Sequence, residues 1–221
     1  MSAPRPEWMA TLVAAVEAER PAAFSPFAPP DDPDRRSAVL MLFAPSVGGG
    51  TDVVLTARSR DLRTHPGQVS FPGGGVDATD AGVVEAALRE TEEEVGVDPA
   101  TVDVVAVMPE LFLSPSGNAV TPVLGWWPTP GDVRVVDPRE VERVERVSLA
   151  ELVDPARRFT VAHPSGYSGP GFEAGGLFVW GFTAMLLGAV LDLAGLAQPW
   201  DASIQRPIPE RVLADWLRKS N

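Results

Sequence analysis

Hydrophobic and polar residues follow two different patterns along this chain. Short apolar runs bounded by turn residues predict buried strands at residues 38–43, 52–57, 102–108, 120–127, 144–147 and 178–180. Helices are predicted at residues 7–20, 81–95, 181–194 and 207–219, and the capping box Ser148-Leu-Ala-Glu151 opens a further short helix. This mixed order of strands and helices predicts an α/β fold, arranged as an α/β/α sandwich with a mixed sheet.

Two segments depart from this pattern. Residues 1–34 combine the first predicted helix with a proline-rich stretch at 21–33, so we expect an N-terminal helical extension. It packs on the domain formed by residues 35–221 or on a partner. Residues 153–176 are rich in glycine and proline and predict a long loop, which at this length is typical of a lid.

One uncharged segment has the length of a membrane span. Residues 174–191 are mostly apolar, but they include four glycines, Asp192 follows directly, and neither end has a basic flank. We therefore expect a buried strand followed by a buried helix, and no membrane partner. The N-terminus lacks a basic segment followed by an apolar core, which predicts a cytoplasmic protein.

The amino-acid composition excludes several kinds of functional site and partner. A chain of 221 residues with 45% hydrophobic residues is long enough for one domain with a substantial core. The absence of cysteine excludes disulfides, thiol catalysis and a Cys-rich zinc site, and two histidines argue against a His-based metal centre. The net charge of −12 argues against broad nucleic-acid binding.

Three glutamates are the strongest chemical signal. Glu90, Glu93 and Glu94 have the i, i+3, i+4 spacing that places side chains on one face of a helix. Carboxylates packed together repel each other, and Mg²⁺ or Mn²⁺, which prefer oxygen ligands, would relieve that repulsion. Glu92 projects away from this face, and Glu85 is placed to pair with Arg89 at i+4. The alternative is an ordinary solvated acidic face.

A glycine-rich turn precedes these glutamates. In the segment Phe71-Pro-Gly-Gly-Gly-Val-Asp-Ala-Thr-Asp80, three glycines allow the backbone to approach a ligand closely. Asp80 or Thr79 can cap the start of the helix, and Gly96 is placed to end it. Turn and helix together predict a compact site for a metal ion and a phosphate.

A local basic cluster lies upstream of the turn. Arg58, Arg60, Arg63 and His65 gather positive charge in an acidic chain, next to the predicted carboxylate site. Arginine binds phosphate through paired hydrogen bonds, so the cluster suits a polyphosphate ligand. The alternatives are a solvated loop with surface arginines and a structural role for His65.

The turn and helix resemble the signature of the Nudix hydrolases. That signature is Gly, five residues, Glu, seven residues, Arg-Glu, an apolar residue, any residue, Glu-Glu, any residue, Gly and an apolar residue. Residues 89–97, Arg-Glu-Thr-Glu-Glu-Glu-Val-Gly-Val, match its second half except at Thr91. Counting from Gly74, the first half has Asp80 in place of Glu and one extra residue before Arg89. In the family that acidic residue holds the arginine, a contact that Asp80 or Asp77 would have to supply.

Residues 54–74 look like the motif of the coenzyme A pyrophosphatase branch of this family. The motif is Leu-Leu-Thr-x-Arg-Ser/Ala, three residues, Arg, three residues, Gly, three residues and Phe-Pro-Gly-Gly, and Val54 is the one mismatch. The resemblance continues in residues 114–117, 121–122 and 180–184, and it spans roughly residues 35–195. It implies the Nudix α/β/α fold.

The resemblance also implies roles for individual residues. Glu90, Glu93 and Glu94 would bind the metal, Arg89 would orient them, and the turn would add a backbone carbonyl at Gly73 and a substrate contact at Gly74. Arg58 and Arg63 would contact the phosphates. The general base would be a signature glutamate or a later carboxylate, for which Glu140 is the best candidate; a solvent-exposed Glu140 is the alternative.

The implied reaction is hydrolysis of the diphosphate of coenzyme A, or of an acyl or oxidised derivative, to 4′-phosphopantetheine (or its acyl form) and adenosine 3′,5′-bisphosphate. Two alternatives remain: hydrolysis of another nucleoside diphosphate derivative, such as ADP-ribose or a dinucleotide, and a non-catalytic nucleotide-binding sensor. Either way a small nucleotide is the expected ligand. The sequence leaves the oligomeric state open, with a homodimer among the alternatives.

Overall fold

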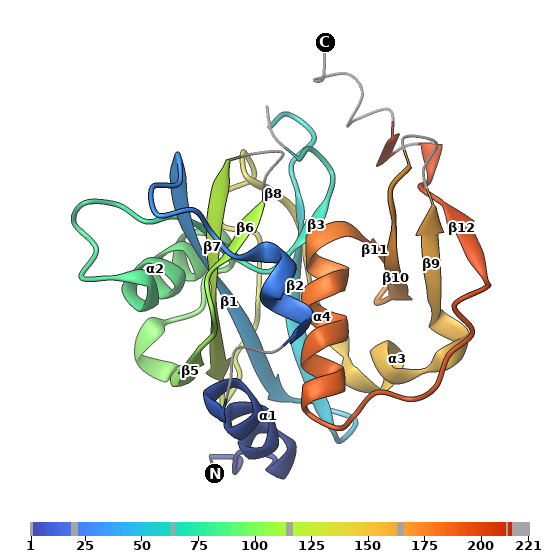
Figure 1. The fold of residues 1–221 in the computed structure, drawn as a ribbon. Coiled ribbons are helices and arrows are strands. Elements are labelled where there is room, and N and C mark those ends of the chain that lie inside the picture. The colour runs from blue at the N-terminus through green and yellow to red at the C-terminus, as the bar shows by residue number, and fades with distance from the viewer. Residues whose placement is uncertain are drawn as a thin grey trace.

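The computed structural model describes residues 2–18, 22–62, 65–113, 117–162, 166–210 and 212–213. Its helices, drawn in Figure 1, are α1 (Glu7–Ala18), α2 (Val83–Val95), α3 (Leu149–Val153) and α4 (Gly181–Leu193), with 3-10 turns η1 (Ala22–Phe27), η2 (Pro99–Thr101) and η4 (Pro155–Arg157). The larger sheet contains β1 (Arg35–Pro45), β2 (Thr51–Arg58), β3 (Val69–Ser70), β4 (Gly73–Gly75), β5 (Asp103–Val107), β6 (Leu111–Leu113), β7 (Asn118–Trp126) and β8 (Val141–Ser148). A smaller sheet contains β9 (Arg158–Ala162), β10 (Ser168–Ala174), β11 (Leu177–Val179) and β12 (Gln205–Pro207).

The larger sheet is mixed, as the sequence predicts. Its strands run in the order β3-β2-β1-β7-β5, with β4 paired to β1, β6 to β7 and β8 to β2. The central pair β1 and β7 is parallel, whereas the other pairings in this sheet are antiparallel. In the smaller sheet, order β11-β10-β9-β12, the pair β9 and β12 is parallel.

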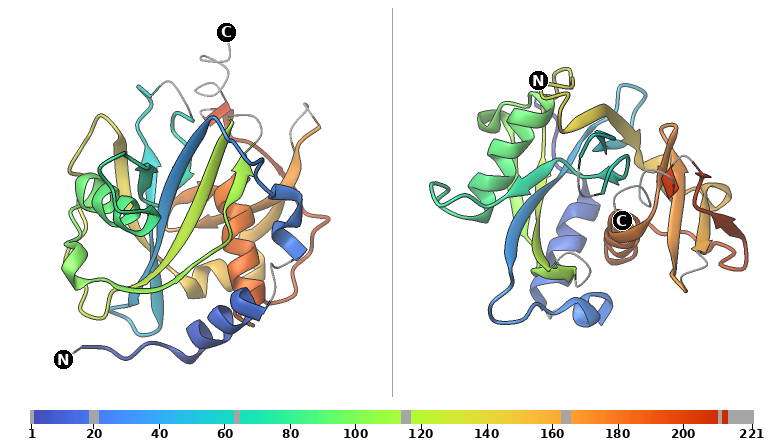
Figure 2. Two further views of the ribbon diagram at one scale, coloured as in Figure 1. Left: turned by 60° about the vertical axis from the view of Figure 1, so that its left-hand side comes forward. Right: turned by 90° about the horizontal axis from the view of Figure 1, so that it is seen from above.

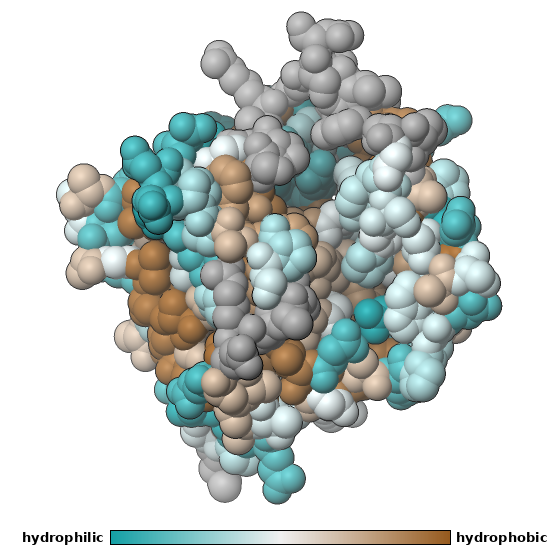
Figure 3. Space-filling view, viewed as in Figure 1, coloured by the Kyte–Doolittle hydropathy of each residue, from teal (hydrophilic) through white to brown (hydrophobic). Residues whose placement is uncertain are grey.

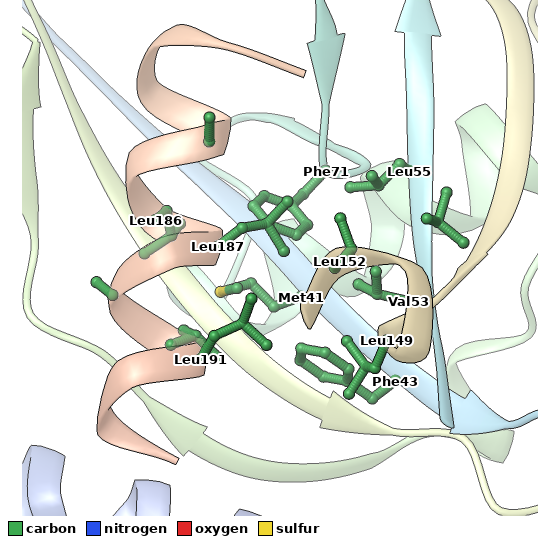
Figure 4. Packing of buried hydrophobic residues seen from close by; sticks show 14 of the residues in the cluster. Met41, Phe43, Val53, Leu55, Phe71, Leu149, Leu152, Leu186, Leu187 and Leu191 are labelled. Carbon is green, nitrogen blue, oxygen red and sulfur yellow. The ribbon is translucent and has the colours of Figure 1, made fainter. Parts of the chain in front are cut away.

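The alternation of side chains on β1 creates two cores. Leu40 and Leu42 point into a cluster with α2, whereas Met41 and Phe43 point into a larger cluster with α1 and α4. Helices therefore cover both faces of the sheet, and the predicted α/β/α sandwich is confirmed (Figures 1 and 2). In the larger core, leucines of α4 and α3 pack against side chains of β1 and β2 (Figure 4).

The N-terminal helix contributes to that larger core. Met9 and Leu12 of α1 and Phe24 of η1 are buried in the same cluster as the sheet residues. Trp8 packs edge-on against Phe43 of β1, with ring centroids 5.1 Å apart. The expected boundary at residue 34 remains a prediction, although this packing joins the two segments through one apolar core.

The expected loop at residues 153–176 is wrong. After η4 the chain forms β9, and β10 returns antiparallel to it. The glycines and the proline of β10 hide its strand character, because these residues are normally depleted in strands. Gly171 has a packing role, since a Cβ there would meet the Phe159 ring and Val161 of β9.

Ser148 caps the start of α3, as predicted, because its hydroxyl accepts the Ala150 N–H at 3.2 Å. The second contact expected of a capping box is wrong, since the Glu151 carboxylate accepts the Gly175 N–H at 3.0 Å and does not close the box on Ser148. Residues 174–191 form β11 and the buried helix α4, as expected. Among the described residues, none of the helices is long and apolar enough to cross a membrane. Most of the expected helix at 207–219 lies outside the described residues.

Hydrophilic residues cover much of the face shown in Figure 3, and hydrophobic residues gather in smaller patches between them. The exposed apolar side chains include Val104 and Val107 of the edge strand β5.

Replacing Leu12 with alanine tests whether the N-terminal helix is part of the core. The Leu12 side chain is fully buried, so its truncation should lower the free energy of unfolding by about 2–5 kcal/mol. Chemical denaturation followed by circular dichroism measures the loss. Glu17→Ala, an exposed change on the same helix, is the control, and equal stabilities of the two variants would contradict the packing of α1.

Candidate active site

Helix α2 begins and ends at glycines. The N-cap is Gly82, so the expected cap at Asp80 or Thr79 is wrong. At the other end, Gly96 adopts the left-handed conformation with φ 75°, and its N–H donates to the Glu92 carbonyl at 2.9 Å. The predicted stop at Gly96 is therefore confirmed.

Asp80 has a different role, because it holds Arg89. The guanidinium donates from Nε to Asp80 Oδ1 at 2.9 Å and from Nη2 to Oδ2 at 3.0 Å. This two-point contact lowers the pKa of Asp80, and the hydrogen bonds from Arg89 are the largest cause. Arg89 also donates to the Gly75 carbonyl at 3.1 Å. The Asp in place of the signature Glu thus preserves the contact that holds the arginine.

The same guanidinium reaches two of the three predicted metal ligands. Its Nη1 donates to Glu90 Oε1 at 3.0 Å and to Glu93 Oε2 at 3.1 Å. The expected pairing of Glu85 with Arg89 is wrong, because the Glu85 carboxylate accepts the Ala81 N–H at the helix start. Arg89 therefore connects the glycine turn, Asp80 and the carboxylates of α2.

Glu94 is the buried member of the carboxylate set, with 3% of its surface exposed. Its Oε2 accepts the Gly73 N–H at 3.1 Å. Burial raises the pKa of Glu94 to about 8, the Gly73 N–H and the Arg58 charge oppose that shift, and Glu90 and Glu140 add to it. Burial also raises the pKa of Glu90, against the opposing effect of Arg89.

Two glycines of β4 make this arrangement sterically possible. Gly73 has φ 148°, and a Cβ there would overlap the backbone of Ala38 on β1. A Cβ on Gly74 would overlap the Glu90 carboxylate. Only residues without a side chain allow β4 to pair with β1 and to contact α2 at the same time.

A cleft of about 370 Å³ opens beside this turn. It brings together five predicted site residues from separate segments: Arg58, Gly73, Gly74, Glu90 and Glu140. The Ser59 N–H donates to the Glu140 carbonyl at 2.8 Å, which fixes Glu140 beside the end of β2. His65 lines the cleft as well, where desolvation and the charge of Arg58 lower its pKa.

The remaining predicted residues lie elsewhere. The Glu93 side chain is 59% exposed and turns toward Arg89, while Glu92 is exposed, as expected. Arg60 pairs with Glu142 at 3.1 Å. Arg63 is outside the described residues.

The donor chemistry of the site fits a divalent cation. Within the part of the chain that the structure describes, no three acidic or histidine side chains converge as a formed metal site, since Arg89 engages Glu90 and Glu93. Yet the charge of Glu140 raises the pKa of both Glu90 and Glu94, Glu90 also raises the pKa of Glu94, and all three side chains offer only oxygen. A hard cation would remove that repulsion in place of a proton.

One departure from the signature leaves no buried polar group without a hydrogen bond. Thr91 stands where the signature has an apolar residue, and it is buried. Its hydroxyl donates to the Ala87 carbonyl at 2.6 Å, so the helix itself satisfies the polar group.

Several cleft residues did not stand out in the sequence. Arg35, Ser37 and Asn118 come from β1 and β7, and Trp180 and Phe182 come from the start of α4. For Arg35 and Ser37, the alternation of side chains along a strand could have predicted their place, because they share a face of β1 with Val39. Trp180 and Phe182 belong to the segment 180–184 that resembles the coenzyme A branch, whereas no local motif marks Asn118.

Comparison with known proteins identifies the family of this chain. The family model for the NUDIX domain matches residues 33–165. "Uncharacterized Nudix hydrolase NudL" of Escherichia coli (strain SMS-3-5 / SECEC) is 42% identical over 151 residues, which cover 64% of this chain and 73% of that protein. The protein with the same description from Shigella boydii serotype 4 (strain Sb227) is 41% identical over 151 residues, with the same coverage.

A solved structure supports the fold. The Nudix hydrolase RenU from M. smegmatis has a TM-score of 0.53 and 18% identity, covering 76% of this chain and 89% of that chain. The chain belongs to the Nudix family. It is a Nudix hydrolase, a pyrophosphohydrolase enzyme, and Nudix hydrolases generally use divalent metal ions.

Replacing Asp80 with asparagine tests the clamp on Arg89. The change keeps the shape but removes the charge that holds the guanidinium, so turnover should fall about 10- to 100-fold, as expected when a group that orients metal ligands is lost. Steady-state kinetics at saturating Mg²⁺ measure it. Asp77→Asn is the control, since that side chain is 69% exposed and 3.8 Å from Arg89. Similar losses in both variants would contradict a specific role for Asp80.

The raised pKa of Glu94 predicts how stability changes with pH when divalent cations are absent. The folded protein keeps a proton that the unfolded chain releases between an ordinary pKa of 4.5 and about 8. The wild type should therefore lose stability as the pH rises through that window, with no contribution below it. Glu94→Gln cannot ionise, so its stability relative to the wild type should rise by on the order of a few kcal/mol across the window.

Urea unfolding in a chelating buffer at several pH values measures this difference. The exposed Glu92→Gln is the control and should follow the wild type. Parallel pH profiles for wild type and Glu94→Gln would show that Glu94 ionises normally in the folded protein.

Proposed function

We propose that this enzyme hydrolyses the diphosphate linkage of coenzyme A or one of its derivatives. The observation that carries the proposal is the cleft, in which Arg58, the Gly73–Gly74 turn, Glu90 and Glu140 meet beside the buried Glu94. Arg58 belongs to the segment 54–74 that resembles the coenzyme A branch. The products would be 4′-phosphopantetheine, or its acyl form, and adenosine 3′,5′-bisphosphate.

Arg58 is placed to hold the diphosphate. Its charge acts on Glu94, so the guanidinium lies close to the carboxylates. Its buried Nε has no hydrogen-bond partner among the described residues, which leaves a donor for an anionic ligand. The proposal for Arg63, to contact a second phosphate oxygen, rests on the sequence motif alone.

Glu90, Glu93 and Glu94 would hold Mg²⁺ or Mn²⁺, with the Gly73 carbonyl as a further ligand. The cation would supply positive charge to the phosphate oxygens and polarise the attacking water. Arg89 keeps Glu90 and Glu93 beside the glycine turn, and Gly73 fixes the Glu94 carboxylate. The substrate can approach the backbone closely at Gly74, where a side chain would collide with Glu90.

Glu140 is the proposed general base. It lines the cleft, and its charge acts on both Glu90 and Glu94. It would take a proton from water as the water oxygen bonds to phosphorus and the bond from phosphorus to the bridging oxygen breaks. One of the signature glutamates is the alternative base.

The same residues suit other nucleoside diphosphate derivatives, such as ADP-ribose or a dinucleotide. The carboxylates would act on the diphosphate through the metal ion, and they do not distinguish the groups attached to either side of it. A non-catalytic sensor is less well supported, since the three signature glutamates and the arginine that orients two of them are all present.

A substrate panel tests the proposal. Free, acylated and oxidised coenzyme A, ADP-ribose, NADH and nucleoside triphosphates are incubated with Mg²⁺ or Mn²⁺, and mass spectrometry identifies the products. Release of adenosine 3′,5′-bisphosphate from coenzyme A is the expected result. Cleavage of ADP-ribose with no reaction on coenzyme A would overturn the substrate assignment and leave the metal chemistry in place.

Isosteric changes of the glutamates test their part in the reaction. Glu93→Gln and Glu94→Gln should each lower turnover by orders of magnitude while the fold is kept, because a ligand charge is lost without a change of shape. Glu92→Gln should be mild, as its side chain points away from the cleft to solvent. Near-normal turnover of both variants at saturating Mg²⁺ would remove Glu93 and Glu94 from the mechanism.

A further inference from the structure

The floor of the cleft extends beyond the residues used so far. On β1, alternation places Arg35, Ser37 and Val39 on one face, and all three line the cleft. The parallel neighbour β7 lies beside β1 (Figure 2). It adds Asn118, which is in register with Arg35. The N-terminal ends of β1 and β7 therefore bring a cation, a hydroxyl and an amide to one place.

These side chains differ in whether the protein itself provides their hydrogen-bond partners. Ser37 Oγ and the Asn118 amide lie within hydrogen-bond distance of each other, at 3.1–3.2 Å. The Arg35 side chain has no hydrogen bond or ion pair to any described residue. Its neighbour Arg36 is bound to Glu110 at 2.7 Å and does not line the cleft. Arg35 is thus a guanidinium with free donors at the rim of a cleft in an acidic protein.

The distance between Arg35 and the glycine turn follows from the strand register. Ala38 pairs with Gly74, so Arg35 lies three residues farther along β1, or about 10 Å at the usual rise of a strand. Arg58, by contrast, lies close enough to Glu94 to affect its pKa. The cleft therefore has two cationic points, one at the carboxylates and one beyond them.

The facing wall is aromatic. Trp180 and Phe182, both half-buried, line the cleft from the start of α4. Tyr167 packs edge-on against Trp180 with ring centroids 5.8 Å apart, and the Thr183 hydroxyl donates to the Val69 carbonyl at 2.8 Å. These contacts fix the rings next to β3. A base or another flat apolar group can pack on such a wall.

We propose that Arg35, with Ser37 and Asn118, forms a second phosphate subsite, for a phosphate that is not part of the diphosphate being cleaved. The ligand class is a nucleotide whose sugar carries an additional phosphate, with its base directed toward Trp180 and Phe182. The inference builds on the proposed function, because coenzyme A has such a phosphate. It assigns the selectivity for that group to Arg35, leaving Arg58 to the diphosphate.

Binding of two related nucleotides to the whole 221-residue chain tests the subsite. Adenosine 3′,5′-bisphosphate and adenosine 5′-monophosphate, which lacks the 3′-phosphate, are titrated by isothermal titration calorimetry in the presence of Mg²⁺. The wild type should bind the bisphosphate more tightly. Arg35→Gln should weaken bisphosphate binding about tenfold or more, since a charge-assisted contact is lost, and change monophosphate binding less than about twofold.

Arg36→Gln is the matched control, because it removes the same charge at the next position on β1 from a side chain already paired with Glu110. It should leave both affinities within about twofold of the wild type. Equal binding of both nucleotides by the wild type, or equal losses for both in Arg35→Gln, would overturn the subsite. Equal effects of Arg35→Gln and Arg36→Gln would reduce it to a general charge effect and also overturn it.

The outcome is independent of the cleavage assay. If the wild type prefers the bisphosphate through Arg35 but does not cleave coenzyme A, the subsite stands and the proposed reaction is wrong. If coenzyme A is cleaved but the preference is absent, the reaction stands and the subsite is wrong.

Discussion

The close approach of β4 to α2 is the constraint on which the site depends. Gly73 and Gly74 pair with β1 on one side and meet Glu94 and Glu90 on the other, and the space for both contacts exists only because neither residue has a Cβ. The cost is a buried carboxyl whose pKa is raised to about 8. A site that holds a carboxylate out of water in this way is prepared for a divalent cation, because binding the cation replaces an unfavourable charge with a neutralised one.

Arg89 gives that arrangement its rigidity. The two-point contact with Asp80 fixes the guanidinium, which in turn holds Glu90 and Glu93 and the Gly75 carbonyl. Turn and helix are thereby joined through one planar group. Asp80 accepts from two donors of this planar fork, so an aspartate makes the contact here although the signature has glutamate and one residue fewer before the arginine.

The sequence predicted those parts of the molecule whose signals are local. The central strands, α2 and α4 follow from apolar periodicity, and the carboxylates follow from spacing on one helix. The hairpin of β9 and β10 was missed because Gly171 serves packing against Phe159 rather than a turn. The cap of α2 was misassigned because the attraction of Asp80 to Arg89, nine residues away, outweighs local capping. Arg35 and Asn118 meet only through the parallel register of β1 and β7, which no local pattern specifies.

The two walls of the cleft have different origins in the chain. The glycine turn, the glutamates, Arg58 and Glu140 all lie within residues 33–165, the segment that matches the family model, whereas Trp180 and Phe182 follow β11 and lie beyond it. These two aromatic residues follow a strand of the smaller sheet and lie at the start of α4. They line the same cleft as Glu90 and Glu140 but belong to a different part of the chain. Substitutions in this C-terminal part can therefore change the shape of the cleft without touching the carboxylates of α2, so that the choice of ligand and the carboxylate set are free to evolve separately.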